Sequence, residues 1–246
     1  IGALAAPKTT LTCGKNRLII HADSQKEGTV TLDLLCNGKT VLAGCRVGLE
    51  TSHRRFQRMR LIEASPAVTR HDDYHMLQGK RLHCTPTAVC RTLTFVSNYA
   101  DTLRMEFRLQ ADGLAFRYLL PAGAHEEMVV NDLTSYPIAN GVRRWMADYD
   151  VSYECFFPLS TDGQERNKRQ QHRWCYPALV EPLDGIYLLI TESNIERGHA
   201  ASWLTNAQDE TLYRVTFGSQ DQPCHTAWAS PWHVVIAGPL TQVVES

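Results

Sequence analysis

The chain contains no apolar run that approaches the roughly 20 residues a helix needs to cross a membrane. It also lacks an excess of charge of either sign, because 25 Lys and Arg residues are balanced by 26 Asp and Glu residues. A net charge of −1 creates no global field that would favour nucleic acid or an anionic lipid surface. We therefore expect neither a membrane helix nor a nucleic-acid partner.

Cysteine is scarce, and none of the eight cysteines forms a Cys-x-x-Cys pair. The absence of such pairs argues against a zinc ribbon and against a thioredoxin-like site. Most of the cysteines are expected to be small buried hydrophobic residues. In an exported protein Cys84 and Cys90 could pair across neighbouring strands, and the sequence leaves this open.

Complete catalytic motifs are also absent. The sequence contains no Gly-x-Ser-x-Gly, no glycine-rich phosphate loop and no His-Glu-x-x-His. Carboxylates are plentiful, but the sequence does not indicate which two of them would lie on either side of a glycosidic bond.

What the chain does contain is a series of short β patterns. Leu103 to Leu109 alternates apolar and polar residues throughout, and Leu114 to Leu120 is a further strand after the turn at Gly113. Asn37-Gly38 is a strong hairpin signal. With little helical periodicity, no repeat and no clear internal boundary, the sequence predicts one all-β domain over residues 1–246, built as a large β-sandwich.

The most informative stretch runs from Asp184 to Asn194. Asp184-Gly185 predicts a tight turn, and the apolar run from Ile186 to Ile190 predicts a strand that is buried on both faces. Glu192 follows where the strand should leave its sheet, a position that suits a ligand for a metal or a sugar. The simpler interpretation is a solvated glutamate in a loop.

Two polar clusters could each be a binding site or an ordinary polar surface segment, and the sequence favours the polar surface segment for both. Ser52 to Arg60 is a basic run that could bind phosphate or an acidic glycan, but the balanced overall charge favours a solvated loop or an edge strand. His71-Asp72-Asp73-Tyr74-His75 resembles a metal cluster, but no helical period surrounds it, so a polar turn is predicted.

Aromatic residues and carboxylates are mixed between residues 145 and 157. Trp145 and Glu154 are the candidate substrate-binding residues of this section, which also holds Tyr149, Tyr153, Phe156 and Phe157. Such a mixture is typical both of a sugar site and of a loop-rich domain junction, and the two interpretations stay open. The polar stretch from Thr161 to Arg173 is predicted to be a mobile loop.

The order of several motifs resembles the N-terminal domain of glycoside hydrolase family 97, a family of bacterial α-glucosidases and α-galactosidases. The matching motifs run almost from end to end of the chain: Asn37 to Leu42, Arg46 to Glu50, Asp112 to Tyr118, Tyr176 to Leu179, Asp184 to Ser193, Ser230 to Gly238 and Glu245-Ser246. Each motif is weak alone, but their shared order is specific.

The resemblance implies a β-super-sandwich related to the galactose-mutarotase fold, which packs against a C-terminal (β/α)₈ barrel that holds the catalytic carboxylates. It implies that Glu192 donates one ligand to an active-site calcium and that the barrel completes the site, because calcium takes six to eight oxygen ligands. It also implies an oligo- or polysaccharide substrate at the domain junction. These 246 residues lack the barrel, so we expect no catalytic residue among them and no hydrolysis by this chain alone.

The chain departs from the family at Ser193, where alanine is usual, and in the continuation from Asn194 to Arg197. The opening Ile1 to Pro7 is similar to the end of a secretory signal peptide, which implies export, in bacteria to the periplasm. Two alternatives remain. One is a free-standing carbohydrate-binding module, and the other is a mutarotase-like enzyme with a histidine base, for which no spacing pairs His71, His75 or His83 with a particular glutamate.

Overall fold

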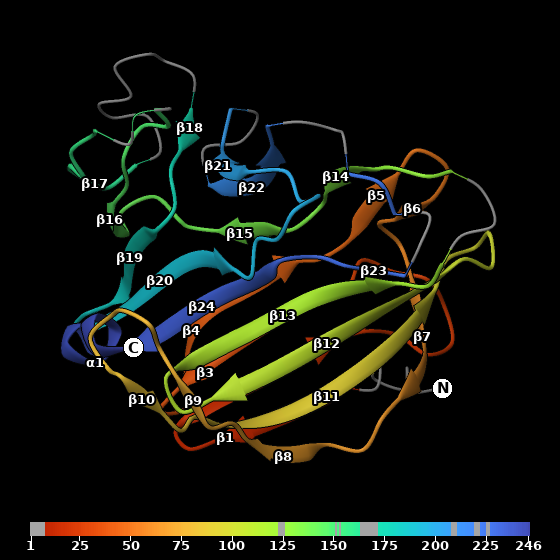
Figure 1. Ribbon diagram of the computed structural model, residues 1–246, viewed down its shortest axis with the longest axis horizontal. Coiled ribbons are helices and arrows are strands. Elements are labelled where there is room, and N and C mark those ends of the chain that lie inside the picture. The colour runs from red at the N-terminus through yellow and green to blue at the C-terminus, as the bar shows by residue number, and fades with distance from the viewer. Residues whose placement is uncertain are drawn as a thin grey trace, which may run out of the picture.

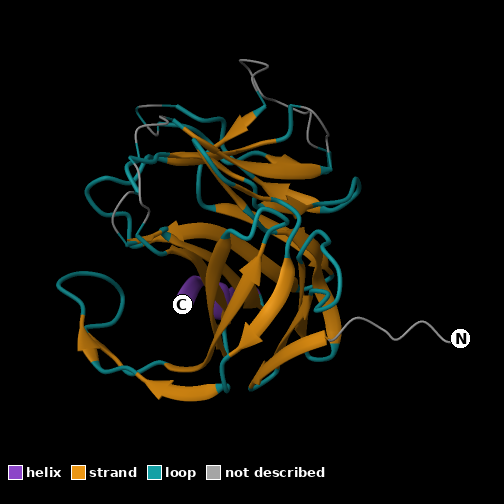
Figure 2. Ribbon diagram, turned by 90° about the vertical axis from the view of Figure 1, so that its right-hand side faces the viewer, coloured by secondary structure: helices purple, strands orange, loops and turns teal. Residues whose placement is uncertain are grey.

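The computed structural model describes residues 8–122, 126–150, 152, 154–162, 172–207, 211–218, 222–224 and 227–246. Within these residues almost all regular structure is β-strand, as Figure 2 shows. No helix in the described residues has the length and apolar character needed to span a bilayer.

Eight strands form the first large sheet. Their order across the sheet is β1 (Lys8–Cys13), β2 (Asn16–His21), β3 (Thr31–Cys36), β4 (Lys39–Arg46), β15 (Ser135–Pro137), β22 (Leu212–Phe217), β21 (Ser202–Thr205) and β18 (Arg173–Trp174). Asn37 and Gly38 both have positive φ between β3 and β4, so the predicted hairpin is confirmed.

Eleven strands form the second sheet, whose long central strands cross the middle of Figure 1. Its main order is β17 (Leu159–Ser160), β16 (Arg143–Trp145), β19 (Ala178–Leu183), β20 (Ile186–Ser193), β24 (Trp232–Gly238), β13 (Gly113–Leu120), β12 (Thr102–Gln110), β11 (Thr87–Val96) and β7 (Arg60–Ala64). β8 (Val68–His71) also pairs with β11, and β23 (Trp228–Ala229) with β13. Neighbouring strands of both sheets run antiparallel.

The two sheets pack face to face, with β1 against β11 and β12 and β2 against β12. The core between them is built by period-two alternation, in which every second side chain points inward. In β12, Leu103, Met105, Phe107 and Leu109 are fully buried, as the alternating sequence predicts. Facing strands contribute Leu18, Ile20, Leu32 and Leu34 to the same cluster.

Three smaller elements complete the described structure. β14 (Val129–Asp132) pairs with β5 (Leu49–Thr51), which pairs with β6 (Arg55–Phe56). β9 (Tyr74–His75) and β10 (His83–Cys84) form a separate two-stranded hairpin. α1 (Leu240–Glu245) packs on β20 and β24 and was not expected from the sequence.

Several further expectations can be compared with the structure. All eight cysteines are free thiols, so Cys84 and Cys90 form no disulfide. In the basic run, Arg54 pairs with buried Glu127 and Arg55 lies 3.2 Å from Glu50. These arginines are therefore held by neighbouring carboxylates. Most of the predicted loop from 161 to 173 lies outside the described residues.

Candidate functional site

Glu192 is the second-last residue of β20, and it is half-buried. Its side chain lies on the same face of the strand as the buried Leu188 and Ile190, because residues two apart share a face. The alternative of a solvated loop position is therefore wrong. The expectation that β20 is buried on both faces is also wrong, since Tyr187 and Leu189 on the opposite face are only partly covered.

His233 lies directly across from Glu192, on the neighbouring strand β24. It is buried, and its ring stacks on Phe116 at a centroid distance of 4.8 Å and meets Tyr118 edge-on at 5.5 Å. Its Nε2 lies 2.9 Å from Oδ2 of Asp132, close enough for an ion pair although the ring N–H is not aligned for a hydrogen bond. A histidine and two carboxylates thus meet at one end of the inner face.

A hydrogen-bond network holds Asp132 in place at the end of β14. The Thr134 backbone N–H donates to its Oδ1 at 2.8 Å. The Thr134 hydroxyl in turn lies 2.6 Å from the Tyr118 hydroxyl, which also accepts the Gly48 N–H at 2.9 Å. Because these groups are buried, each hydrogen bond avoids the penalty of an unpaired polar atom and fixes the position of its neighbour.

Ser202 on β21 links Glu192 to the other sheet. Its hydroxyl donates to Oε2 of Glu192 at 2.7 Å. Burial raises the pKa of the Glu192 carboxyl above its usual value and the charge of Asp132 raises it too, whereas the Ser202 hydrogen bond and nearby His233 oppose the rise. Burial and the charge of Glu192 likewise raise the pKa of the Tyr176 hydroxyl.

We name Glu192, Ser202, His233, Asp132 and Tyr176 the inner polar cluster. Its two carboxylates are not equivalent, because Asp132 already holds His233 and the Thr134 amide. Calcium takes six to eight oxygen ligands, so these residues cannot enclose a calcium ion alone. Among the described residues, the group that brings three ligating side chains within 4.8 Å lies elsewhere and does not include Glu192. The cluster fits a role in which Glu192 supplies one oxygen ligand to a site that another part of the protein completes.

Trp145 and Glu154, the two candidate substrate-binding residues, are not brought together with Glu192 by any contact between described residues. Trp145 lies in β16, half-buried, with Tyr187 at 6.0 Å and the Arg143 guanidinium 5.8 Å from its ring. Glu154 is exposed, in a segment without regular structure. Tyr153 falls outside the described residues.

Sequence reasoning missed His233, Asp132 and Ser202. A signal for His233 exists, because alternation from Val235 and Ala237 places it on the inner face of the last strand. For Asp132 and Ser202 no local pattern exists, since Asp132 comes from a strand distant in sequence and Ser202, ten residues after Glu192, meets it from the other sheet.

Residues 13–246 match the family model of the glycosyl-hydrolase 97 N-terminal domain. A protein of Streptomyces bingchenggensis (strain BCW-1), named a probable retaining alpha-galactosidase, is 23% identical over 222 residues, which are 89% of this chain and 33% of that protein.

Solved structures show the same fold. The crystal structure of a beta-arabinopyranosidase superposes with a TM-score of 0.83 at 20% identity, covering 92% of this chain and 39% of that one. A glycoside hydrolase family 97 enzyme from Pseudoalteromonas sp. strain K8, in complex with acarbose, gives a TM-score of 0.77 at 18% identity and covers 94% of this chain and 35% of that one. The chain thus spans 33% to 39% of the length of these relatives. The predicted all-β super-sandwich is confirmed, and the chain belongs to the glycosyl-hydrolase 97 N-terminal domain family.

Proposed function

We propose that this chain is the non-catalytic N-terminal domain of a calcium-dependent α-glycosidase of α-glucosidase or α-galactosidase type. It would pack on a C-terminal (β/α)₈ catalytic barrel and donate Glu192 as one calcium ligand. The observation that carries the proposal is the family match over residues 13–246, in a chain that spans only a third of its curated relative. Two of the relatives support α-glycosidase chemistry by name or ligand, a probable retaining alpha-galactosidase and a family 97 enzyme in complex with panose, whereas a third is named a beta-arabinopyranosidase.

The surroundings of Glu192 suit the donation of one ligand. The Ser202 hydrogen bond fixes one carboxylate oxygen, and the strand behind it limits movement of the backbone. A calcium ion held there would supply a Lewis acid able to polarise an oxygen of the substrate. Because burial makes the Glu192 charge unfavourable, a cation at this position gains from a carboxylate whose charge little else neutralises.

The surface beyond Glu192 suits a partner domain. Ile195, three residues after Glu192, has 53% of its surface exposed, and elsewhere on the chain Phe156 has 91% exposed. Large apolar side chains this exposed are typical of a surface that another domain covers. We place the oligo- or polysaccharide substrate at this junction, with Trp145 and Glu154 as the residues of this chain that would contact it. The resemblance of Ile1 to Pro7 to the end of a signal peptide supports export, to the periplasm in a bacterium.

The test is a calcium titration of hydrolysis by the full-length protein. Glu192→Gln removes one negative charge and keeps the shape, so calcium affinity should fall at least about tenfold and hydrolysis at limiting calcium should fall with it. Added calcium should recover part of the activity by mass action. Glu196→Gln, an exposed carboxylate four residues further on, is the matched control. Calcium curves that coincide for wild type and Glu192→Gln would refute the ligand role.

A carbohydrate-binding module is the second candidate, favoured by the exposed rings of Phe156 and Phe157. It predicts that the chain of 246 residues alone binds maltooligosaccharides and that Phe156→Ala weakens this binding. The leading proposal predicts no such binding, and no turnover of nitrophenyl α-glycosides by the chain alone, because the acid and the second carboxylate would lie in the barrel.

A further inference from the structure

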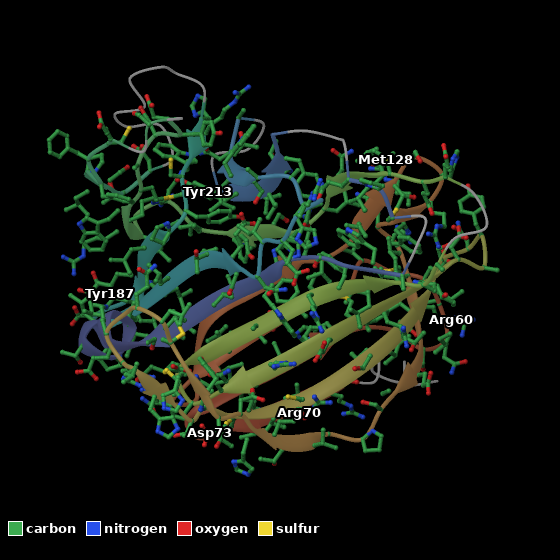
Figure 3. The ribbon with its side chains drawn as sticks, viewed as in Figure 1. Arg60, Arg70, Asp73, Met128, Tyr187 and Tyr213 are labelled. Carbon is green, nitrogen blue, oxygen red and sulfur yellow. The ribbon has the colours of Figure 1, made fainter. Side chains whose placement is uncertain are left out.

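The β9–β10 hairpin carries a group of metal-ligating side chains far from the inner polar cluster. Figure 3 places Asp73 at the margin of the molecule, and Figure 1 shows the hairpin beside α1. The Met76 N–H donates to the Leu82 carbonyl at 2.8 Å, and the Asp72 N–H to the Pro86 carbonyl at 3.0 Å, so the ribbon between them is held in register.

That register determines which side chains meet. His75 lies directly opposite His83, so the two imidazoles emerge on one face, where they stack 4.7 Å apart at an angle of 9°. Asp73 precedes His75 by two residues and therefore shares this face. Its Oδ1 lies 2.7 Å from Nε2 of His83. One ligand atom from each of the three residues lies within 4.8 Å of the others.

We propose that Asp73, His75 and His83 form a zinc-binding site on the β9–β10 hairpin. Two imidazole nitrogens and one carboxylate oxygen are a ligand set that suits zinc, whereas calcium and magnesium prefer oxygen ligands alone. Tetrahedral zinc with bonds of about 2.0–2.2 Å places its ligand atoms roughly 3.3 Å apart. The Asp73–His83 separation is 2.7 Å and no pair of ligand atoms exceeds 4.8 Å, so rotations of exposed side chains would suffice to close the site. Water would occupy the fourth position.

The neighbouring residues indicate what the ion would do. The segment between the two histidines is exposed and has an apolar tip, where Leu77 is fully exposed and Leu82 is 69% exposed. Such a short two-stranded ribbon has few apolar contacts of its own to hold it. An ion bound between Asp73, His75 and His83 would join both arms of the ribbon. The zinc site is therefore a clamp on the hairpin, independent of the proposed calcium ligand Glu192.

The test is zinc binding by the metal-depleted protein, measured by isothermal titration calorimetry with zinc chloride. Wild type should bind one zinc ion more per chain than His83→Ala or Asp73→Asn. The affinity of that site should fall at least tenfold in either variant, since even outer-shell changes at zinc sites lose 10–100-fold. His71→Ala is the matched control, because His71 is an exposed histidine on the preceding strand that contacts Thr87 at 2.9 Å and lies outside the group. Cys84→Ser tests binding by the nearby thiol.

Zinc isotherms that coincide for wild type and His83→Ala would overturn the proposal, as would an equal loss in His71→Ala or Cys84→Ser. A second readout is tryptic cleavage after Lys80 and Arg81, which lie between the two histidines. Zinc should slow cleavage at these bonds severalfold in wild type and not in His83→Ala, with trypsin checked on an unrelated peptide at the same zinc concentration. Cleavage that is equally fast with and without zinc in wild type would contradict the clamp.

Discussion

Two aspartate–histidine pairs in this molecule have nearly the same length and opposite surroundings. Asp132 and His233 lie 2.9 Å apart between the sheets, with side chains 3% and 5% exposed. Asp73 and His83 lie 2.7 Å apart on the β9–β10 hairpin, with side chains 70% and 51% exposed. Distance alone would rank the two contacts as equals. Because they differ in burial, we expect the Asp132–His233 pair to contribute to stability and the Asp73–His83 pair to be available to bind a ligand.

The physical reason is solvation. At the exposed pair, water stabilises either partner when the other is removed, so the contact itself contributes little. At the buried pair, removal of one partner leaves polar atoms that water cannot reach. Asp132 also accepts the Thr134 N–H, whereas Asp73 holds the side chain of a histidine on a hairpin with little core.

The largest effect is expected for Asp132→Ala. The change removes the acceptor of the buried Thr134 amide and the carboxylate that faces His233, and we expect the free energy of unfolding to fall by about 3 kcal/mol. Urea denaturation followed by circular dichroism measures it. A loss below about 1 kcal/mol would mean that the inner polar cluster repacks or admits water. The buried pair would then contribute no more to stability than an exposed pair does.

An intermediate pair tests whether the effect follows burial. Asp33 lies 2.6 Å from His21, with side chains 25% and 32% exposed, and it also accepts the Gly44 N–H at 2.7 Å. Like Asp132→Ala, Asp33→Ala removes a contact to a histidine and a hydrogen bond from a backbone N–H, but at a site that water partly reaches. We expect a loss of about 1–2 kcal/mol in the same denaturation assay. A loss as large as that of Asp132→Ala would show that the loss of stability does not depend on how deeply the pair is buried.

The fold could be predicted from the sequence where pattern and contact are local. β12 follows the alternation of Leu103 to Leu109, and the β3–β4 turn follows Asn37-Gly38. The short helix α1 was missed because its six residues, Leu240 to Glu245, give less than two turns in which a period could be recognised.

The site was less predictable than the fold. The end of a predicted strand singles out Glu192 and a family resemblance implies its role, but its partner Ser202 lies on the other sheet and His233 on a neighbouring strand. Residues 71–75 are predicted to form a polar turn because no helical period surrounds them, and the sequence does not show that His83 joins Asp73 and His75 through the register of the hairpin. Both groups depend on strand pairing, which alternation does not determine.

Glu192→Gln tests whether the charge of the Glu192 carboxylate lowers the stability of the fold, as expected for a residue that serves binding and not folding. The pKa of Glu192 is raised in the folded state, so the fold favours the protonated form and loses stability as pH rises through the unfolded and then the folded pKa. Glutamine does not titrate. The variant should therefore match wild type below about pH 4 and become the more stable protein towards pH 7. Calcium-free urea denaturation at both pH values measures the difference. A wild type that gains stability over the variant as pH rises would contradict the inferred direction.

The smallest effect is expected for Asp73→Ala without metal. Both members of its pair are mostly exposed, so the free energy of unfolding should change by less than about 0.5 kcal/mol, within the range of surface substitutions. The same urea denaturation measures it, with chelator present. Saturating zinc should then stabilise wild type in proportion to the logarithm of zinc concentration over Kd and leave Asp73→Ala almost unchanged. A metal-free loss comparable to that of Asp132→Ala would mean that the hairpin pair supports the fold, and the contrast between the buried and the exposed pair would no longer hold.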